Sequence, residues 1–221
     1  MTNSFWFPIQ LSLLVAVVAA ILVFIVGICV SRLFVSKRFK GKLVWETVFM
    51  LPLVLPPSVV GYLLILFFGT NSIVGQCFEK LLGTTLMFTP WANIIAASVV
   101  AFPLMFQSAN IGFESISKDV IGAARVDGAS ELCILIKIML PMAGKALMTG
   151  AILSFTRALG EFGATLMFAG NIPGKTETIP TAIYVAIESG ENRLTYLYVL
   201  ISICTAFILL VITNSFKRYK Y

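Results

Sequence analysis

Two charged side chains, Arg157 and Glu161, interrupt a strongly apolar stretch over residues 146–169. Their separation of four residues places both on one face of a helix, where they can form an ion pair. An unpaired charge at membrane depth costs about 2.5 to 3.5 kcal/mol on insertion scales. Two interpretations are therefore open: Arg157 helps an anion to pass, or the pair braces helix packing, since pairing satisfies both groups without a substrate.

Three prolines, Pro52, Pro56 and Pro57, would interrupt the hydrogen-bond ladder of a helix over residues 47–68. Freed carbonyls at membrane depth are tolerated where they face protein or a water-filled cavity. Proline is also frequent in membrane helices generally, so a broken helix that lines a pathway and an ordinary kinked helix both remain open. Ser58 is the nearest polar side chain. With Arg157 and Glu161 it forms a candidate translocation pathway.

Residues for metal, covalent or nucleotide chemistry are not arranged as a site. The chain has no histidine, which removes the commonest metal ligand and the usual proton shuttle at neutral pH. Its four cysteines, Cys29, Cys77, Cys133 and Cys204, lack metal-ligand spacing and are interpreted as unpaired. The glycine-rich phosphate loop of the Gly-x-x-x-x-Gly-Lys-Ser/Thr type is absent. We expect no catalytic residue, no metal and no cofactor, and any ATP must be bound by another chain.

The composition is that of a membrane protein. Of its 221 residues, 59% are hydrophobic and 12% are charged, whereas a soluble domain carries about 25% charged residues. A helix needs about 20 apolar residues to cross the hydrocarbon layer. Five segments qualify: residues 9–30, 47–68, 91–113, 146–169 and 194–215. We therefore predict an all-α membrane protein in which residues 1–221 form a single transmembrane domain with five spans.

The lysines and arginines predict the orientation of these spans. The loop after the first span, the loop after the third and the C-terminal tail together hold twelve of the 16 basic residues, whereas only Lys80, Lys175 and Arg193 lie on the opposite side. Short cytoplasmic loops carry the positive excess, so the N-terminus is expected outside and the C-terminus in the cytoplasm. The net charge of +6 is explained by this bias, and no nucleic-acid partner is expected.

The segment over residues 114–145 is too polar to span the membrane and too well patterned to be a slack linker. Ser117 can cap a short helix over residues 116–126, and Gly128 after Asp127 can end it. Ser130 with Glu131 can cap a second helix, which Pro141 helps to end or bend. The small and charged residues of this helix-turn-helix suit a docking surface for a soluble partner, because small residues allow close approach and charges fix register. An ordinary amphipathic surface helix is the alternative.

The spacing of this segment resembles the cytoplasmic loop motif of ABC-importer permeases: Glu-Ala-Ala, three residues, Gly, nine residues, Ile, one residue, Leu-Pro. Ala123, Ala124 and Gly128 match, as does the run from Ile138 to Pro141, and Gly122 stands where the glutamate is usual. In that family the loop forms the coupling helix, which sits in a groove of the ATPase subunit. The resemblance therefore implies a type I importer permease fold and assigns coupling to Gly122, Ala123, Ala124, Arg125, Asp127, Gly128, Ala129, Leu140 and Pro141.

Two further stretches resemble the molybdate branch of these permeases: residues 51–62, and residues 157–165 running on to 170–180. The sulfate and thiosulfate permeases share much of the second stretch, but they are usually longer and pair two different chains. The resemblance implies import of molybdate, with tungstate indistinguishable, across the cytoplasmic (inner) membrane. It further implies two copies of an ABC ATPase and an extracytoplasmic oxyanion-binding protein that meets the loop over residues 171–193. Five helices are few to enclose an anion pathway, so we also expect a homodimer with two copies facing each other around a two-fold axis. An ordinary exposed loop is the alternative for that segment.

Other classes of protein remain as rivals. An ion-coupled secondary transporter would use Glu161 as its ion site, but such folds usually show an internal repeat, and none is evident. An intramembrane headgroup transferase would need several clustered carboxylates for metal, whereas Asp127 has only Glu131 nearby. A pure scaffold protein would not require an ATPase.

Overall fold

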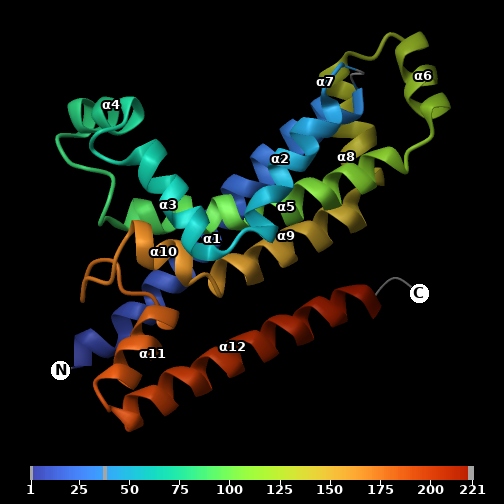
Figure 1. Cartoon of the computed structure of the whole chain (residues 1–221). Coiled ribbons are helices and arrows are strands. Elements are labelled where there is room, and N and C mark those ends of the chain that lie inside the picture. The colour runs from blue at the N-terminus through green and yellow to red at the C-terminus, as the bar shows by residue number, and fades with distance from the viewer. Residues whose placement is uncertain (1, 37–38, 219–221) are drawn as a thin grey trace.

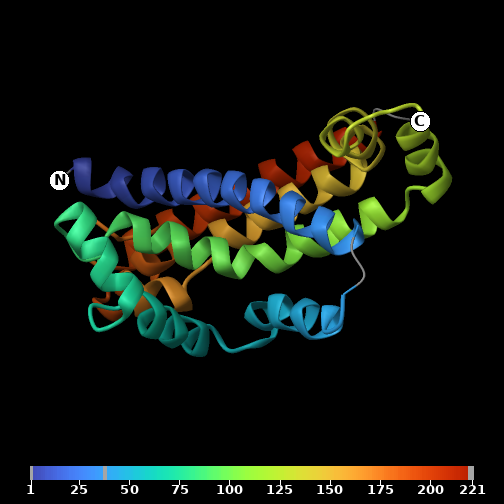
Figure 2. The ribbon, with the colours of Figure 1, turned by 90° about the horizontal axis from the view of Figure 1, so that it is seen from above.

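Three long helices form the centre of the molecule. The computed structural model describes residues 2–36 and 39–218, and helices with short connections make up this part of the chain. Helices α1 (Thr2–Ser36), α5 (Pro90–Glu114) and α9 (Gly144–Leu159) run side by side, with α5 packed against both of the others (Figures 1 and 2). The sequence-based prediction of an all-α fold is confirmed.

Glycines at the helix contacts allow this close packing. An added Cβ at Gly27 of α1 would stand 2.7 Å from Cγ of Met105, and one at Gly150 of α9 would stand 2.7 Å from Cβ of Ser108. Small residues let membrane helices approach closely where no hydrophobic force drives them together. The two glycines therefore set the distances from α1 and α9 to α5.

Two buried hydroxyl groups fasten the same three helices. Ser31 Oγ donates to the carbonyl oxygen of Phe106 at 3.0 Å, and Ser154 Oγ donates to that of Ala101 at 3.2 Å. Both serines are fully buried. Interhelical hydrogen bonds of this kind contribute about 0.6 kcal/mol on average in a membrane protein, so they fix register more than they add stability.

The predicted second span is divided into two helices. Helix α2 (Lys42–Val54) and helix α3 (Pro57–Phe68) meet at a bend of 117°. Leu55 and Pro56 are extended, and Pro57 occupies the first position of α3, where its missing N–H removes no hydrogen bond. Of the two alternatives that the prolines left open, the structure therefore has a broken helix over residues 47–68 and not a kinked one. Helix α4 (Ile73–Leu82) follows.

The predicted fourth span is also divided. Helix α9 ends at Leu159, the chain turns through residues 160–162, and helix α10 (Gly163–Phe168) begins there and packs against α3. A continuous helix over residues 146–169 is therefore wrong. On its N-terminal side, α9 meets the helical segment Glu131–Met142 at a bend of 78°.

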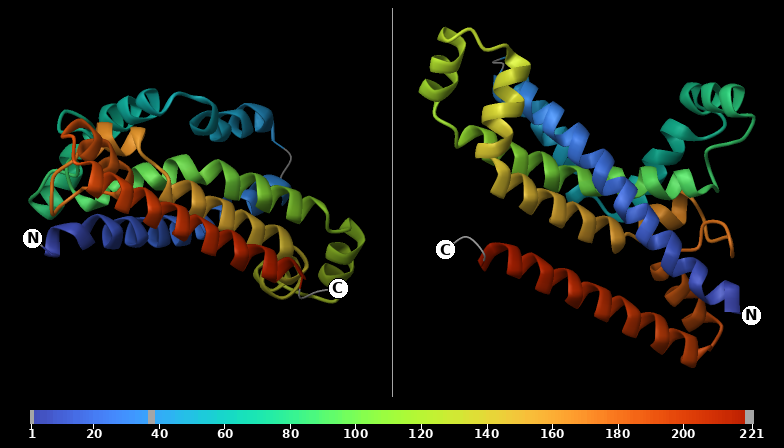
Figure 3. Two further views of the ribbon diagram at one scale, coloured as in Figure 1. Left: turned by 90° about the horizontal axis from the view of Figure 1, so that it is seen from below. Right: turned by 180° about the vertical axis from the view of Figure 1, so that it is seen from behind.

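The last two helices form a hairpin at the edge of the molecule. Helix α11 (Ile179–Glu188) is followed by α12 (Asn192–Arg218), which packs chiefly on α11 and stands apart from the central helices over most of its length (Figure 3). Its exposed side chains include Leu200, Ile203 and Phe207, at 62%, 63% and 66% exposure. This apolar surface requires lipid or another protein.

The length and composition of the described helices give a first estimate of the membrane spans. Phe5–Ser36 within α1 and Pro90–Glu114 are long and apolar enough to cross a membrane, and each of the two bent pairs passes the same test when it is taken as one span. Helix α12 is 27 residues long and carries the apolar segment Asn192–Ile208. The five-span single domain stays a prediction.

Candidate coupling loop and membrane ion pair

Helix α6 (Lys118–Val126) is the first part of the predicted helix-turn-helix. Ser117 caps it by accepting a hydrogen bond from the N–H of Asp119 at 3.2 Å. The helix ends at Asp127, and Gly128 has a φ of 82°, the left-handed conformation that glycine adopts without strain. The N–H of Ala129 returns to the carbonyl of Ala124 at 3.0 Å. The local sequence signals thus give the helix that they predict.

The second part of the loop is less regular. Ser130 accepts a hydrogen bond from the N–H of Cys133 at 3.3 Å and so begins α7 (Glu131–Ile134). A π-helical turn, Leu135–Met139, and the short helix α8 (Leu140–Met142) follow. Pro141 lies inside α8, and the turn into α9 comes at Ala143. Pro141 therefore lies two residues before the bend that it was expected to make.

The predicted coupling residues divide between two faces. Ala124 is buried, and Ala129 and Leu140 are partly buried against the helix core. Gly122 is partly exposed, and a Cβ added there would meet no atom within 4 Å. The residues that a partner can reach are the exposed ones: Ala123, Arg125, Asp127, Gly128 and Pro141.

Two apolar side chains beside these residues are also exposed, and neither belongs to the loop motif. Val126 at the end of α6 is 88% exposed, and Leu132 in α7 is 66% exposed. Neither lies in a predicted span, so lipid does not account for them. On a protruding loop, exposed apolar side chains next to charged ones suit a protein-docking surface, in which apolar groups form the buried centre and polar groups form the rim.

A carboxylate clasp ties this loop to α1. Glu131 accepts hydrogen bonds from Nε of Arg125 at 2.7 Å and from Nη2 of Arg125 at 3.3 Å, and it also pairs with the guanidinium of Arg32. The hydrogen bond from Arg125 is the main cause that lowers the pKa of Glu131, and the same contact raises the pKa of Arg125. Arg32 was not predicted to take part, because 99 residues separate it from Glu131 and no local pattern connects them.

The two charges in the predicted fourth span form an ion pair. Nη1 of Arg157 lies 2.7 Å from Oε2 of Glu161, and the two side chains are 30% and 2% exposed. The other carboxylate oxygen of Glu161 accepts a hydrogen bond from the N–H of Ala164 at 2.8 Å. Glu161 therefore joins the end of α9 to the beginning of α10. These contacts favour the bracing interpretation for Glu161. Arg157 is partly exposed, so a contact with an anion remains open for it.

The two helix breaks lie against each other. A Cβ added at Gly163, the first residue of α10, would stand 2.6 Å from Cβ of Pro57, the first residue of α3. Ser58 is exposed at this same end of α3. The fold thus brings the segment that holds Ser58 next to the segment that follows the Arg157–Glu161 pair. All three candidate pathway residues belong to these two breaks.

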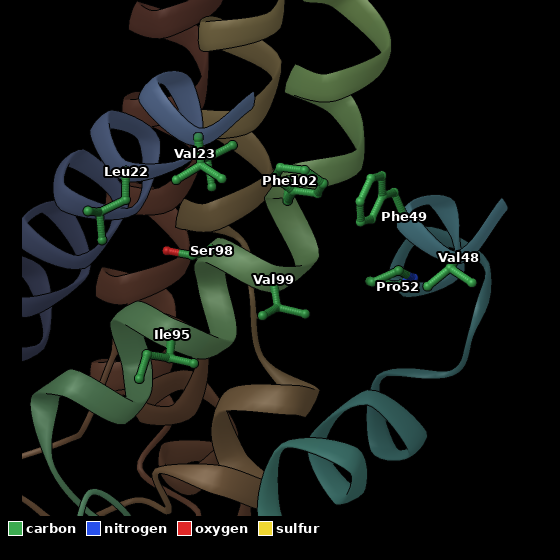
Figure 4. Close-up of a pocket in the computed structure, with 10 residues that line it drawn as sticks. Leu22, Val23, Val48, Phe49, Pro52, Ile95, Ser98, Val99 and Phe102 are labelled. Carbon is green, nitrogen blue, oxygen red and sulfur yellow. The ribbon is translucent and has the colours of Figure 1, made fainter. Parts of the chain in front are cut away.

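A separate cavity between α1, α2 and α5 is almost entirely apolar (Figure 4). It has a volume of about 460 Å³, and Ser98 is its polar lining residue, with an Oγ that has no hydrogen-bond partner in the described structure. An oxyanion needs several hydrogen-bond donors or cations. This cavity therefore does not have the lining of an anion pathway. Across residues 2–36 and 39–218, no cluster of three histidine, cysteine, aspartate or glutamate side chains could hold a metal.

Comparison with known families assigns the chain. The model of the family described as "Binding-protein-dependent transport system inner membrane component" matches residues 24–219. The chain belongs to this family. The resemblance found in the loop motif is thereby confirmed, and the chain is a membrane component of a transport system.

Curated relatives of this permease family match over nearly the full chain. A putative molybdenum transport system permease protein of Bacillus subtilis (strain 168) is 51% identical over 217 residues, covering 98% of this chain and 96% of the relative. The molybdenum transport system permease protein of Escherichia coli (strain K12) is 38% identical over 223 residues, covering 99% and 96%. A sulfate transport system permease protein of Salmonella typhimurium is 33% identical and is covered over 64% of its length.

Solved structures give the fold of the permease. A bacterial ABC transporter involved in import of the acidic polysaccharide alginate aligns with a TM-score of 0.75 at 15% identity, covering 100% of this chain and 81% of that chain. The inward-facing MetNI methionine ABC transporter aligns with a TM-score of 0.69 at 15% identity, covering 96% and 94%. The predicted ABC importer permease fold is confirmed.

Proposed function

We propose that this permease is the membrane-spanning subunit of an ATP-binding-cassette importer that carries molybdate across the cytoplasmic membrane, with tungstate as its close chemical substitute. The observation that carries the proposal is identity of 51% and 38% to molybdenum permeases over nearly the whole length of both chains. The sulfate permease matches less of its own length. Sulfate or thiosulfate import is the alternative.

The energy for transport comes from a separate ATPase subunit that docks on the loop of α6 and α7. Support comes from the exposed Val126 and Leu132 beside Ala123 and Arg125 on a protruding segment. The Glu131 clasp to Arg32 gives this loop a direct connection to α1. Movement of the docked loop would therefore be passed to the central helices.

Two copies of the permease enclose the pathway, with two ATPase subunits beneath them and an oxyanion-binding protein on the outer side. Few helices are available in one chain to surround an anion, and a two-fold arrangement is the simplest closed symmetry for two copies of one chain. The exposed apolar face of α12 supports a further contact surface in the membrane. ATP binding closes the ATPase pair, the docked loops move with it, and the helix bundles change from inward-open to outward-open.

The anion passes near the two helix breaks. The beginning of α3 carries the exposed Ser58, and half-helix N-termini at membrane depth favour anionic groups. Arg157 supplies a partly exposed positive charge, and Glu161 holds its guanidinium in place. In this arrangement Arg157 and Ser58 contact the anion, and Glu161 is a positioning residue.

In the membrane, the N-terminus lies outside and the C-terminus lies in the cytoplasm. The excess of lysine and arginine in the loops around α6 supports this orientation. It places the coupling loop on the side where ATP is found. It also places the loop between α10 and α11 on the side of the binding protein.

The test is to purify the permease with its associated ATPase, reconstitute the complex in vesicles and measure ATP hydrolysis with a loaded binding protein. We expect molybdate- and tungstate-loaded protein to stimulate hydrolysis, and sulfate-loaded protein to leave it at the basal rate. Stimulation mainly by the sulfate-loaded binding protein would identify sulfate, and not molybdate, as the transported anion. Uptake that survives ATP depletion with an ion gradient intact would instead establish an ion-coupled carrier.

A further inference from the structure

A second cavity, distinct from the candidate pathway, lies where α1, α2, α5 and α6 meet. Its volume is about 620 Å³, and four of its lining residues are basic: Arg32, Lys42, Lys118 and Arg125. Glu114 is the acidic residue in its lining. The cavity therefore has an excess of positive charge, which suits an anionic ligand.

Two of these cations are already engaged by the clasp, and two are not. Arg32 and Arg125 both pair with Glu131. Lys42 makes only long contacts, with its Nζ 3.5 Å from Glu46 and 3.9 Å from Glu114. Within the described chain, no ion pair is recorded for Lys118, which is exposed. The free capacity for an anion thus resides chiefly in the two lysines.

Apart from Ser36, the remaining lining of the cavity is apolar and includes the buried Phe113 and Ile116. A ligand that fills it must combine negative charge with a hydrocarbon portion. Free inorganic phosphate has only the charge. An anionic phospholipid has both.

The depth of the cavity agrees with a phospholipid headgroup. The apolar run of α1 over residues 9–30 is about 33 Å long at 1.5 Å per residue, which matches a hydrocarbon core of about 30 Å. Arg32 follows that run by two residues, and Glu114 follows the apolar run of α5 directly. Both therefore lie at the level of the headgroups.

The turn that follows Lys42 carries side chains typical of a membrane interface. Leu43, Val44 and Trp45 are 75%, 64% and 54% exposed. Tryptophan is enriched where headgroups meet hydrocarbon. The surface next to the cavity is thus one that faces lipid.

We propose that this cavity binds the phosphate of an anionic phospholipid, with Lys42 and Lys118 contacting the phosphate and Phe113 and Ile116 contacting the glycerol and upper acyl carbons. The lipid bridges α2 and α6, two elements that the clasp does not join. The site requires only that the chain spans a membrane, so it stands independently of the transported substrate.

The test uses the purified full-length permease, with any subunit that co-purifies, delipidated and titrated in mild detergent while bound lipid is counted by native mass spectrometry. Phosphatidylglycerol, phosphatidylcholine and inorganic phosphate are the three probes. We expect saturable binding of phosphatidylglycerol, weaker binding of phosphatidylcholine, and no displacement by inorganic phosphate. A basic residue near an anionic surface strengthens binding by about fivefold, so the Lys42→Gln/Lys118→Gln variant, which removes two such residues, should bind phosphatidylglycerol roughly thirtyfold more weakly.

The matched control is Lys145→Gln, which removes an exposed cation at the start of α9 that does not line the cavity and should retain full binding. If loss of Lys42 disturbs folding, the single variant Lys118→Gln, which keeps Lys42, still tests the site and should bind phosphatidylglycerol more weakly. Equal binding of the two lipids, unchanged binding by the double variant, or displacement by inorganic phosphate would each overturn the proposal. Unchanged lipid binding together with loss of the ATPase subunit would assign the cavity to an acidic protein partner instead.

Discussion

Glu161 binds Arg157 with one carboxylate oxygen and the beginning of the next helix with the other. The contact to Nη1 of Arg157 is 2.7 Å, and the contact to the N–H of Ala164 is 2.8 Å. One buried side chain therefore sets both the position of a partly exposed guanidinium and the point at which the broken span resumes. The two roles can be separated by substitution.

The Glu161→Gln substitution should destabilise the permease by about 1 to 3 kcal/mol, because Arg157 loses its charged partner while the amide oxygen can still accept from Ala164. Arg157→Gln should cost more, since it leaves a carboxylate buried without a counter-ion. Thermal unfolding in detergent measures both. The double variant Arg157→Gln/Glu161→Gln should recover much of the lost stability.

Transport distinguishes bracing from a direct anion contact. If Arg157 contacts the anion, the double variant should be stable yet remain defective in molybdate uptake. Full uptake by Arg157→Gln with normal assembly would remove Arg157 from the pathway and leave the ion pair a purely structural role. Ser58→Ala serves as the comparison at the other break, with a smaller loss expected because it removes no charge.

The Glu131→Gln substitution should weaken the connection between the coupling loop and α1. We expect ATP hydrolysis to continue while uptake per ATP falls severalfold, because the loop can then move without moving α1. Because the pKa of Glu131 is lowered in the folded protein, the clasp contributes its full stability above the ordinary carboxyl pKa of about 4.3. That contribution is lost as the pH falls through the lowered pKa of Glu131. Coupling through the clasp should therefore not vary near neutral pH.

Glu79→Gln is the control for this experiment, since Glu79 is exposed on α4, away from the loop. It should leave both hydrolysis and uptake unchanged. Equal uptake per ATP in Glu131→Gln and the unsubstituted permease would contradict a role for the clasp in coupling.

Local signals in the sequence predicted the local structure well. Ser117, Ser130 and Gly128 begin and end the loop helices as their side chains and conformational freedom dictate. Pro56 and Pro57 likewise mark the break between α2 and α3. Each of these features depends on atoms within a few residues, so one sequence contains the information.

The break after α9 was missed because apolar composition does not distinguish one helix from two. Gly163 lies against Pro57, and the turn between Gly160 and Gly163 depends on where Glu161 places its carboxylate. The pairing of Arg32 with Glu131 was missed for a related reason. It depends on the tertiary contact between α1 and the loop, which no spacing reveals.

Two glycine substitutions should have opposite effects on stability. Gly150→Ala places a methyl group 2.7 Å from Ser108 and 2.9 Å from Met105, so it should destabilise the permease by about 1 to 3 kcal/mol. Gly122→Ala meets no atom within 4 Å in a helical position and should stabilise α6 by about 0.5 to 1 kcal/mol. The comparison is made by thermal unfolding, and a similar shift for both would mean that α5 and α9 are not in close contact.

The most direct test of the docking surface is Val126→Asp. Val126 is 88% exposed and packs against nothing that its loss would disturb, so the fold should be unaffected. A charge placed at the centre of an apolar contact costs more than about 2 kcal/mol, which weakens association by a factor of about 30 or more. We therefore expect the ATPase subunit to be lost during purification of this variant.

The control is Ile73→Asp on α4, where a similarly exposed apolar residue lies on the opposite side of the predicted membrane. Retention of the ATPase by Val126→Asp, or its loss from Ile73→Asp, would place the docking surface elsewhere.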